Sequence, residues 1–92
     1  MEINEKTVGA NYFRALKKAL QIRLNRKKIY NDNYSEYGKE GLFWLLMVKM
    51  IRLKQQHQKP INNNYEKEED TLIDIINYAI FLLDILERGK QK

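Results

Sequence analysis

Apolar and polar residues recur at helical spacing in three segments, and no stretch alternates as a strand would. In residues 10–29, apolar side chains gather on one side of a helical wheel and basic ones on the other, which predicts an amphipathic helix. Residues 40–56 and 68–88 are apolar almost all round, and Gly89 is expected to end the last helix in a left-handed conformation. The pattern predicts an all-α fold, a small bundle of three main helices within one domain spanning residues 1–92.

Two helices that are apolar almost all round present more surface than one amphipathic partner covers. A three-helix monomer would then expose an apolar patch on the order of several hundred Å², and such patches usually mark interaction surfaces. A helix of this kind belongs in the middle of an assembly. We therefore expect a homodimer that buries the second and third helices in a shared bundle.

The composition narrows the class of protein. A chain of 92 residues, 43% hydrophobic and 32% charged, makes one small soluble domain. The absence of cysteine excludes disulfides, thiolate zinc sites and a cysteine nucleophile. The longest apolar run, Leu42 to Val48, is far shorter than the roughly 20 residues of a membrane span. The first residues do not resemble a secretory signal, so a cytoplasmic location without membrane contact is expected.

The net charge of +5 is unevenly distributed along the chain. Residues 1–60 carry 13 Lys or Arg against 5 Asp or Glu, and residues 61–92 carry 4 against 7. This polarity suits either phosphate binding or pairing between a basic front and an acidic back, and composition does not separate the two. Binding of a nucleic acid is less favoured, because a basic helix face requires no more than solvation.

The polar residues of the third segment form one narrow stripe on a helical wheel, consisting of Asp70, Asp74, Asn77, Asp84 and Arg88. Carboxylates one turn apart, such as Asp70 and Asp74, can share a magnesium ion with waters and substrate phosphates. The stripe is also what the solvent face of an ordinary surface helix looks like. We favour the solvent face and keep Mg²⁺ as the alternative.

Four cations are candidates for phosphate binding. Arg23 and Lys27 fall on the apolar side of the first helix, and Lys49 and Arg52 are the only polar groups on the apolar stretch of the second. An inward cation needs an anion, either a ligand phosphate or a carboxylate of the third helix, unless it extends to water near the helix end. Tyr30 and Tyr34 are candidates for stacking on a base, or for packing their loop onto the core.

Two motifs carry a family resemblance. Lys-x-x-Arg-Leu at residues 49–53 is followed by Asp-Thr-Leu-x-Asp-x-x-Asn-Tyr-Ala at residues 70–79. With the glycine-containing loop before them, they resemble the nucleotide-modification-associated domain 1 family of phages and bacteria, over about residues 26–86. The resemblance implies a small helical protein of phage nucleotide metabolism, similar in character to MazG-type nucleotide pyrophosphohydrolases. No single reaction is attached to the family.

Three positions depart from the family pattern. The family usually has an acid, an arginine and an aspartate where this chain has Ile29, Leu45 and Val48. The resemblance therefore implies a site that has been partly filled with apolar side chains, and a second-helix carboxylate that has been lost. We accordingly favour a non-catalytic or weakly active domain that binds a nucleotide or a protein. The alternatives are a magnesium-dependent nucleoside triphosphate pyrophosphohydrolase and a phage inhibitor that blocks a host defence complex by surface contact.

Overall fold

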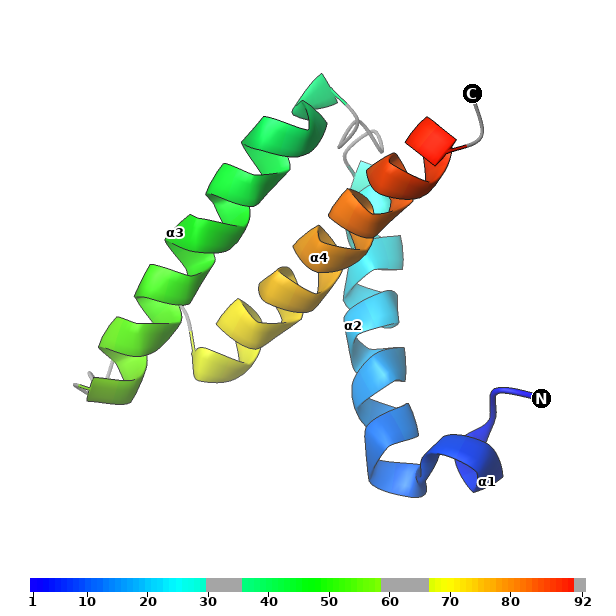
Figure 1. Ribbon diagram of the computed structural model, residues 1–92. Coiled ribbons are helices and arrows are strands. Elements are labelled where there is room, and N and C mark those ends of the chain that lie inside the picture. Colours follow the sequence, from blue (N-terminus) through cyan, green and yellow to red (C-terminus); the bar gives the residue numbers. More distant parts are fainter. Residues whose placement is uncertain (30–35, 59–66, 91–92) are drawn as a thin grey trace. The chain divides into compact units, whose positions relative to one another are not determined.

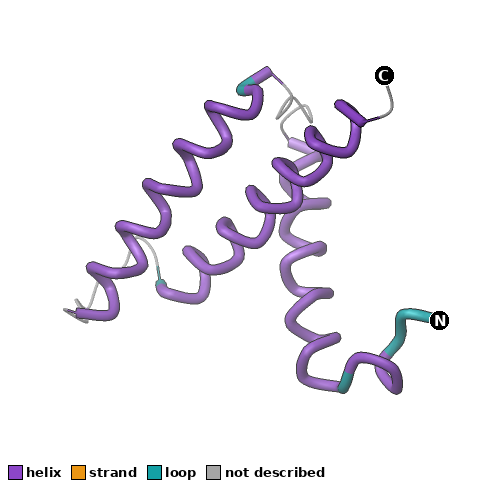
Figure 2. Tube along the Cα trace, viewed as in Figure 1, coloured by secondary structure: helices purple, strands orange, loops and turns teal. Residues whose placement is uncertain are grey.

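The structure describes residues 1–29, 36–58 and 67–90 of the computed structural model, and most of these residues are helical (Figures 1 and 2). A short helix, α1 (Glu5–Val8), precedes three long ones: α2 (Ala10–Ile29), α3 (Gly38–Gln58) and α4 (Glu68–Lys90). These residues contain no strand, so the predicted all-α class is confirmed. None of the described helices is long and apolar enough to cross a membrane.

The ends of the long helices follow the prediction closely. The bounds of α2 match it, whereas α3 is two residues longer at each end and α4 continues to Lys90. The predicted left-handed stop at Gly89 is wrong, because the only described residues with positive φ are Gly9 and Gly38. A glycine inside a helix costs only about 1 kcal/mol. Arg88 and Lys90 in the last turn favour continuing, because cations interact well with the carboxyl end of a helix.

Helix α1 was not predicted, and side-chain caps explain why it forms. The Asn4 side chain accepts hydrogen bonds from the backbone N–H groups of Lys6 and Thr7 at 3.0 and 3.1 Å. The Thr7 hydroxyl in turn accepts from the Asn4 N–H at 2.9 Å, which completes a capping box. Gly9, at φ 93°, then redirects the chain into α2.

The contacts divide the chain into two compact units, residues 1–31 and 32–92. In the first unit, α1 packs on the beginning of α2. Within α2, the Lys17 ammonium lies 5.1 Å from the centre of the Phe13 ring one turn away, which is a cation–π contact. The expectation of a single domain spanning residues 1–92 stays a prediction.

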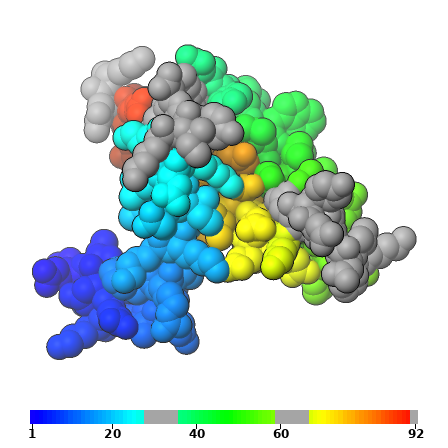
Figure 3. Space-filling model, turned by 180° about the vertical axis from the view of Figure 1, so that it is seen from behind, coloured from blue at the N-terminus to red at the C-terminus, as the bar shows by residue number. Residues whose placement is uncertain are grey.

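In the second unit, α3 and α4 run side by side and antiparallel as a helical hairpin (Figure 1). The space-filling view shows the beginning of α4, in yellow, against the green α3 (Figure 3). Two glycines shape the start of α3. Gly38 has φ 68°, and a Cβ on Gly41 would lie 2.9 Å from the Tyr37 Cβ, so neither position accepts a larger residue without strain.

The hairpin is unusual in what it buries. Of its five buried positions among the described residues, only Leu42 and Ile73 are apolar. The rings of Tyr78 and Phe81 on α4 are in contact, with 6.4 Å between their centres. The polar residues Thr71, Asp74 and Asn77 are buried instead. Large apolar side chains of α3 lie outside, and they are Phe43, Trp44, Met47, Val48, Met50 and Ile51. The expectation that α3 sits in the middle of an assembly stays a prediction, as does the homodimer.

Candidate functional site

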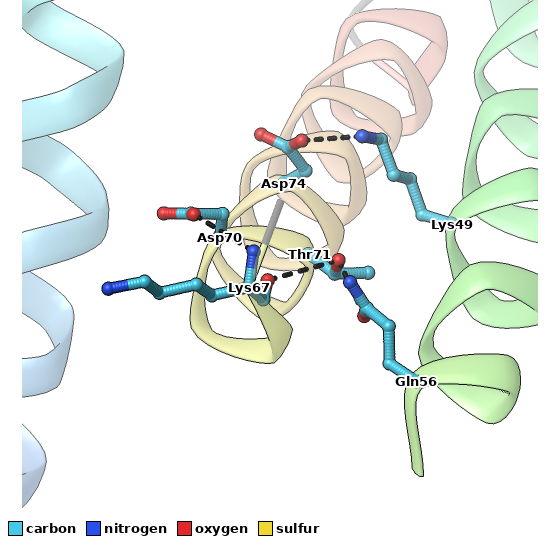
Figure 4. A network of polar contacts seen from close by, with 6 residues as sticks. All are labelled: Lys49, Gln56, Lys67, Asp70, Thr71 and Asp74. Atoms are coloured by element: carbon cyan, nitrogen blue, oxygen red, sulfur yellow. Dashed lines mark hydrogen bonds and ion pairs between the residues drawn. The ribbon is translucent and has the colours of Figure 1, made fainter. Parts of the chain in front are cut away.

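The polar side chains that α3 and α4 direct toward each other form the candidate site (Figure 4). We call this group, Lys49, Gln56, Thr71 and Asp74, the polar seam. Lys49 and Gln56 are seven residues apart, which places both on one face of α3 two turns apart. Thr71 and Asp74 are three residues apart and share a face of α4 for the same reason. The antiparallel arrangement then sets Gln56 against Thr71 and Lys49 against Asp74.

An ion pair is the strongest contact of the polar seam. The Lys49 Nζ lies 2.7 Å from Asp74 Oδ2, and the two side chains are 17% and 9% exposed. A charged hydrogen bond at this distance is stronger than a neutral one. Because both groups have left bulk water, removing one partner would leave the other as an uncompensated charge. The pair therefore fixes how the two helices are aligned.

One turn nearer to the start of α4, a neutral hydrogen bond continues the polar seam. The Thr71 hydroxyl donates to Gln56 Oε1 at 2.9 Å and also lies 3.4 Å from the carbonyl oxygen of Lys67. A hydroxyl has one proton to donate, and the shorter contact is the better hydrogen bond. Thr71 is completely buried, so its hydroxyl depends on these protein acceptors.

Asp70 has a separate structural role at the beginning of α4. Its Oδ2 accepts a hydrogen bond from the backbone N–H of Lys67 at 3.2 Å (Figure 4). This is the backward half of a capping box, in which a carboxylate in the first turn satisfies the N–H that precedes the helix. The negative charge also interacts favourably with the positive end of the helix dipole. The carboxylate remains exposed.

The predicted solvent face of the third helix is wrong at its centre. Asp74 is 6% exposed and Asn77 is 3% exposed. Farther along the helix, Asp84 and Arg88 form an exposed ion pair at 2.7 Å. The helical wheel correctly placed these residues on one side of the helix. It did not predict that this side faces α3 instead of water. Lys49 supplies a countercharge from the facing helix, so that the polar side of α4 can form the helix contact.

The remaining phosphate-binding candidates are distributed between the two units. Arg52 lies on the exposed surface of α3, one turn from Lys49. Arg23, which is partly buried, and Lys27, which is exposed, belong to α2 in the first unit. The structure thus joins Lys49 to a carboxylate of its own hairpin and leaves the four-cation site a prediction.

Several other predicted positions can be placed only in part. Tyr30 and Tyr34, the candidates for base stacking, lie outside the described residues, as does the side chain of Ile29. Leu45 is partly buried. Val48 is half exposed and lies about 100° around α3 from Lys49, so it does not line the polar seam.

The donor set does not fit Mg²⁺. Among the described residues, no three Asp, Glu, His or Cys side chains are grouped closely enough to hold a metal ion. Of the two predicted ligands, Asp74 is buried against an ammonium group and Asp70 caps α4. A hydrated magnesium ion needs carboxylates that face water and substrate phosphates. The buried Asp74, paired with Lys49, does not offer that setting.

Sequence reasoning missed Gln56 and Thr71, although signals for both were present. Gln56 follows Lys49 by two helical turns and so had to share its face. Thr71 lies between the two aspartates of the family-like motif.

Comparisons with protein-family models, with curated proteins and with solved structures found no match for this chain. The resemblance to the nucleotide-modification-associated domain 1 family stays an expectation that rests on the two motifs.

Proposed function

We propose that the chain is a non-catalytic helical binding domain of phage-type nucleotide metabolism, which acts in the cytoplasm and binds a protein or a nucleotide without hydrolysing it. The observation that carries this proposal is the ion pair between Lys49 and Asp74 at 2.7 Å. The residues best suited to hold a phosphate and a metal ion neutralise each other inside the hairpin.

The chemistry of a pyrophosphohydrolase makes the point concrete. Such an enzyme needs carboxylates that hold a metal ion, and the metal ion activates water and neutralises phosphate charge. Here Asp74 would have to leave Lys49 before it could take that role, and a buried ammonium group would then lose its countercharge. Asp70 would have to give up the N–H of Lys67. Both carboxylates already stabilise the fold, which supports binding over turnover.

A protein is the ligand that the surface of the hairpin fits best. Large apolar side chains of both helices are exposed, among them Trp44 on α3 and Leu83 on α4. Exposed apolar surface on this scale is typical of protein contact, whereas a nucleotide requires several cations converging on its phosphates. The same surface also supports the narrower alternative of a phage inhibitor that blocks a host complex.

The test is to incubate the protein with ribo- and deoxyribonucleoside triphosphates and Mg²⁺ or Mn²⁺, and to measure pyrophosphate release and binding heat. We expect no release that depends on metal. The matched variants are Asp70→Ala, Asp74→Ala and, as a control on the same helix, Asp84→Ala. Metal-dependent release that disappears in the first two variants but persists in the control would establish the pyrophosphohydrolase instead. Circular dichroism confirms that each variant is folded.

A further inference from the structure

The side of α3 that points away from α4 carries a continuous apolar stripe. Its members are spaced three and four residues apart, as one face of a helix requires, and we call them the outer face of α3: Phe43, Trp44, Met47, Met50 and Ile51. At 100° per residue, Met47 lies about 160° around the helix from Lys49 of the polar seam. Trp44 is 66% exposed, Ile51 55% and Met47 40%.

The stripe is symmetric about Met47. Trp44 and Met50 are each three residues from Met47, and Phe43 and Ile51 are each four residues away. Seven residues out, still on the same side of the helix, lie two exposed groups of opposite charge, Glu40 before the stripe and Lys54 after it. Reversing the direction of the helix therefore exchanges an aromatic for an aliphatic side chain, and an acid for a base.

We propose that the outer face of α3 binds the same face of a second copy of this chain, antiparallel, with a twofold axis at Met47. A twofold interface must be self-complementary. In this one, Trp44 meets Met50 of the other copy, and sulfur next to an aromatic ring is a favourable contact. Glu40 meets Lys54 of the other copy at both ends.

Charge selects this orientation and this occupant. A parallel arrangement would set Glu40 against Glu40 and Lys54 against Lys54, and like charges across an interface are unfavourable. The antiparallel arrangement pairs all four charges with opposite ones. An unrelated partner would give no reason for charges placed at equal distances on either side of the centre of the stripe.

The exposed area is sufficient for a dimer. The five side chains of the outer face, with the adjacent Val48, expose on the order of 700 Å² per copy. A stable interface of standard size buries roughly 800 Å² per partner, and the flanking Glu40 and Lys54 supply the difference. Helices with large side chains between them pack with axes up to about 10 Å apart, so the Cα atoms of two Met47 residues on the twofold axis would lie about 5 Å apart.

That separation is within reach of a disulfide, which gives a direct test in a chain without cysteine. We expect Met47→Cys to cross-link under mild oxidation into a species of twice 11.1 kDa. The control is Ile51→Cys, on the same face, whose two copies would lie about 12 Å apart along the axes and should not cross-link. Cross-linking of both variants to the same extent, or of neither, would overturn the proposal.

A charge exchange tests the orientation without touching the apolar stripe. Glu40→Lys alone and Lys54→Glu alone should each raise the dimer dissociation constant about 10-fold, because each creates two like-charged contacts. The double variant Glu40→Lys, Lys54→Glu should return to within about 3-fold of the unchanged protein. Sedimentation at low salt measures all four. A monomeric unchanged protein at about 100 µM, or a double variant no better than the single ones, would contradict the proposal.

Discussion

The two sides of α3 both carry large apolar residues, but only the inner side combines them with polar groups that pair across the hairpin. The side that packs against α4 carries Lys49 and Gln56 beside the buried Leu42, and the side that points away carries Phe43, Trp44 and Met47. In most surface helices the apolar side forms the intramolecular contact and the polar side meets water. Here polar groups align the two helices, while most of the large apolar side chains remain available for association.

The two sides of α3 are expected to contribute to different processes, the polar seam to folding of the hairpin and the outer face to association. A polar seam specifies one alignment, because shifting α4 along α3 would break the ion pair between Lys49 and Asp74. Apolar contacts are less selective but contribute more free energy per area. Changes on the polar seam should therefore affect unfolding, whereas changes on the outer face should affect association.

The largest effect should come from breaking the ion pair. Asp74→Ala should lower the free energy of unfolding by about 3 kcal/mol or more, because it leaves the Lys49 ammonium buried without its countercharge. The matched control is Asp84→Ala, which removes an aspartate of the same helix from an exposed pair with Arg88. That change should stay within about 0.5 kcal/mol. Urea unfolding measures the loss of stability in both variants. Equal losses would contradict the claim that the buried ion pair matters more than the exposed one.

On the opposite side of α3, Trp44→Ala should weaken association rather than folding of the hairpin. A central tryptophan in an interface typically contributes about 2 kcal/mol or more, which is a dissociation constant raised about 30-fold. Lys90→Ala, an exposed change at the end of α4 and so outside the outer face of α3, is the control. Light scattering over a concentration series measures both. A variant that associates as well as the unchanged protein would show that the outer face is not the interface.

A smaller loss is expected inside the polar seam at Thr71. Thr71→Val keeps the shape of the side chain but removes the proton donated to Gln56 Oε1 at 2.9 Å. The cost should be about 1 kcal/mol, since a partly buried side-chain hydrogen bond between the two helices is lost. Adding Gln56→Leu removes that acceptor and should recover part of the loss. Urea unfolding measures the series, and no cost in the single variant would show that the hydrogen bond is dispensable.

The smallest effect should appear at the start of α4. Asp70→Ala should cost about 0.5 kcal/mol, because the Lys67 N–H loses its acceptor and the helix dipole loses a favourable charge. Asp70→Asn keeps an acceptor without the charge, so its stability should lie between those of the unchanged protein and Asp70→Ala. Thermal unfolding at low and high salt separates these contributions. An Asp70→Ala variant that unfolds with no loss would remove the capping role.

Most of the fold could be predicted from the sequence, because apolar residues recur at helical spacing along each of the long helices. The bounds of α2 follow directly from its apolar repeat. Helix α1 escaped prediction because its capping box uses Asn4 and Thr7 instead of the common pairing with Glu or Gln. The predicted helix end at Gly89 was wrong, because the cost of one glycine in a helix is small and Arg88 and Lys90 favour the last turn of α4.

The candidate site was predictable only as a set of residues on shared faces. The wheel placed Asp74 and Asn77 together, but the usual expectation that polar residues face water assigned them the wrong surroundings. Pairing with Lys49 depends on how two distant helices align, and no local pattern specifies that alignment. An internal partner for Lys49 was one of two open interpretations, and the structure shows it to be Asp74.

The most direct test of the polar seam is a double-mutant cycle on Lys49→Met and Asp74→Leu, measured by urea unfolding. If the polar seam holds the helices together, each single variant should lose about 3 kcal/mol, because each removes the ion-pair partner of a largely buried charge. The double variant should lose less than about 1 kcal/mol, giving a coupling energy of about 5 kcal/mol. Losses that simply add, with a coupling energy below about 0.5 kcal/mol, would show that Lys49 and Asp74 do not depend on each other and would contradict the account.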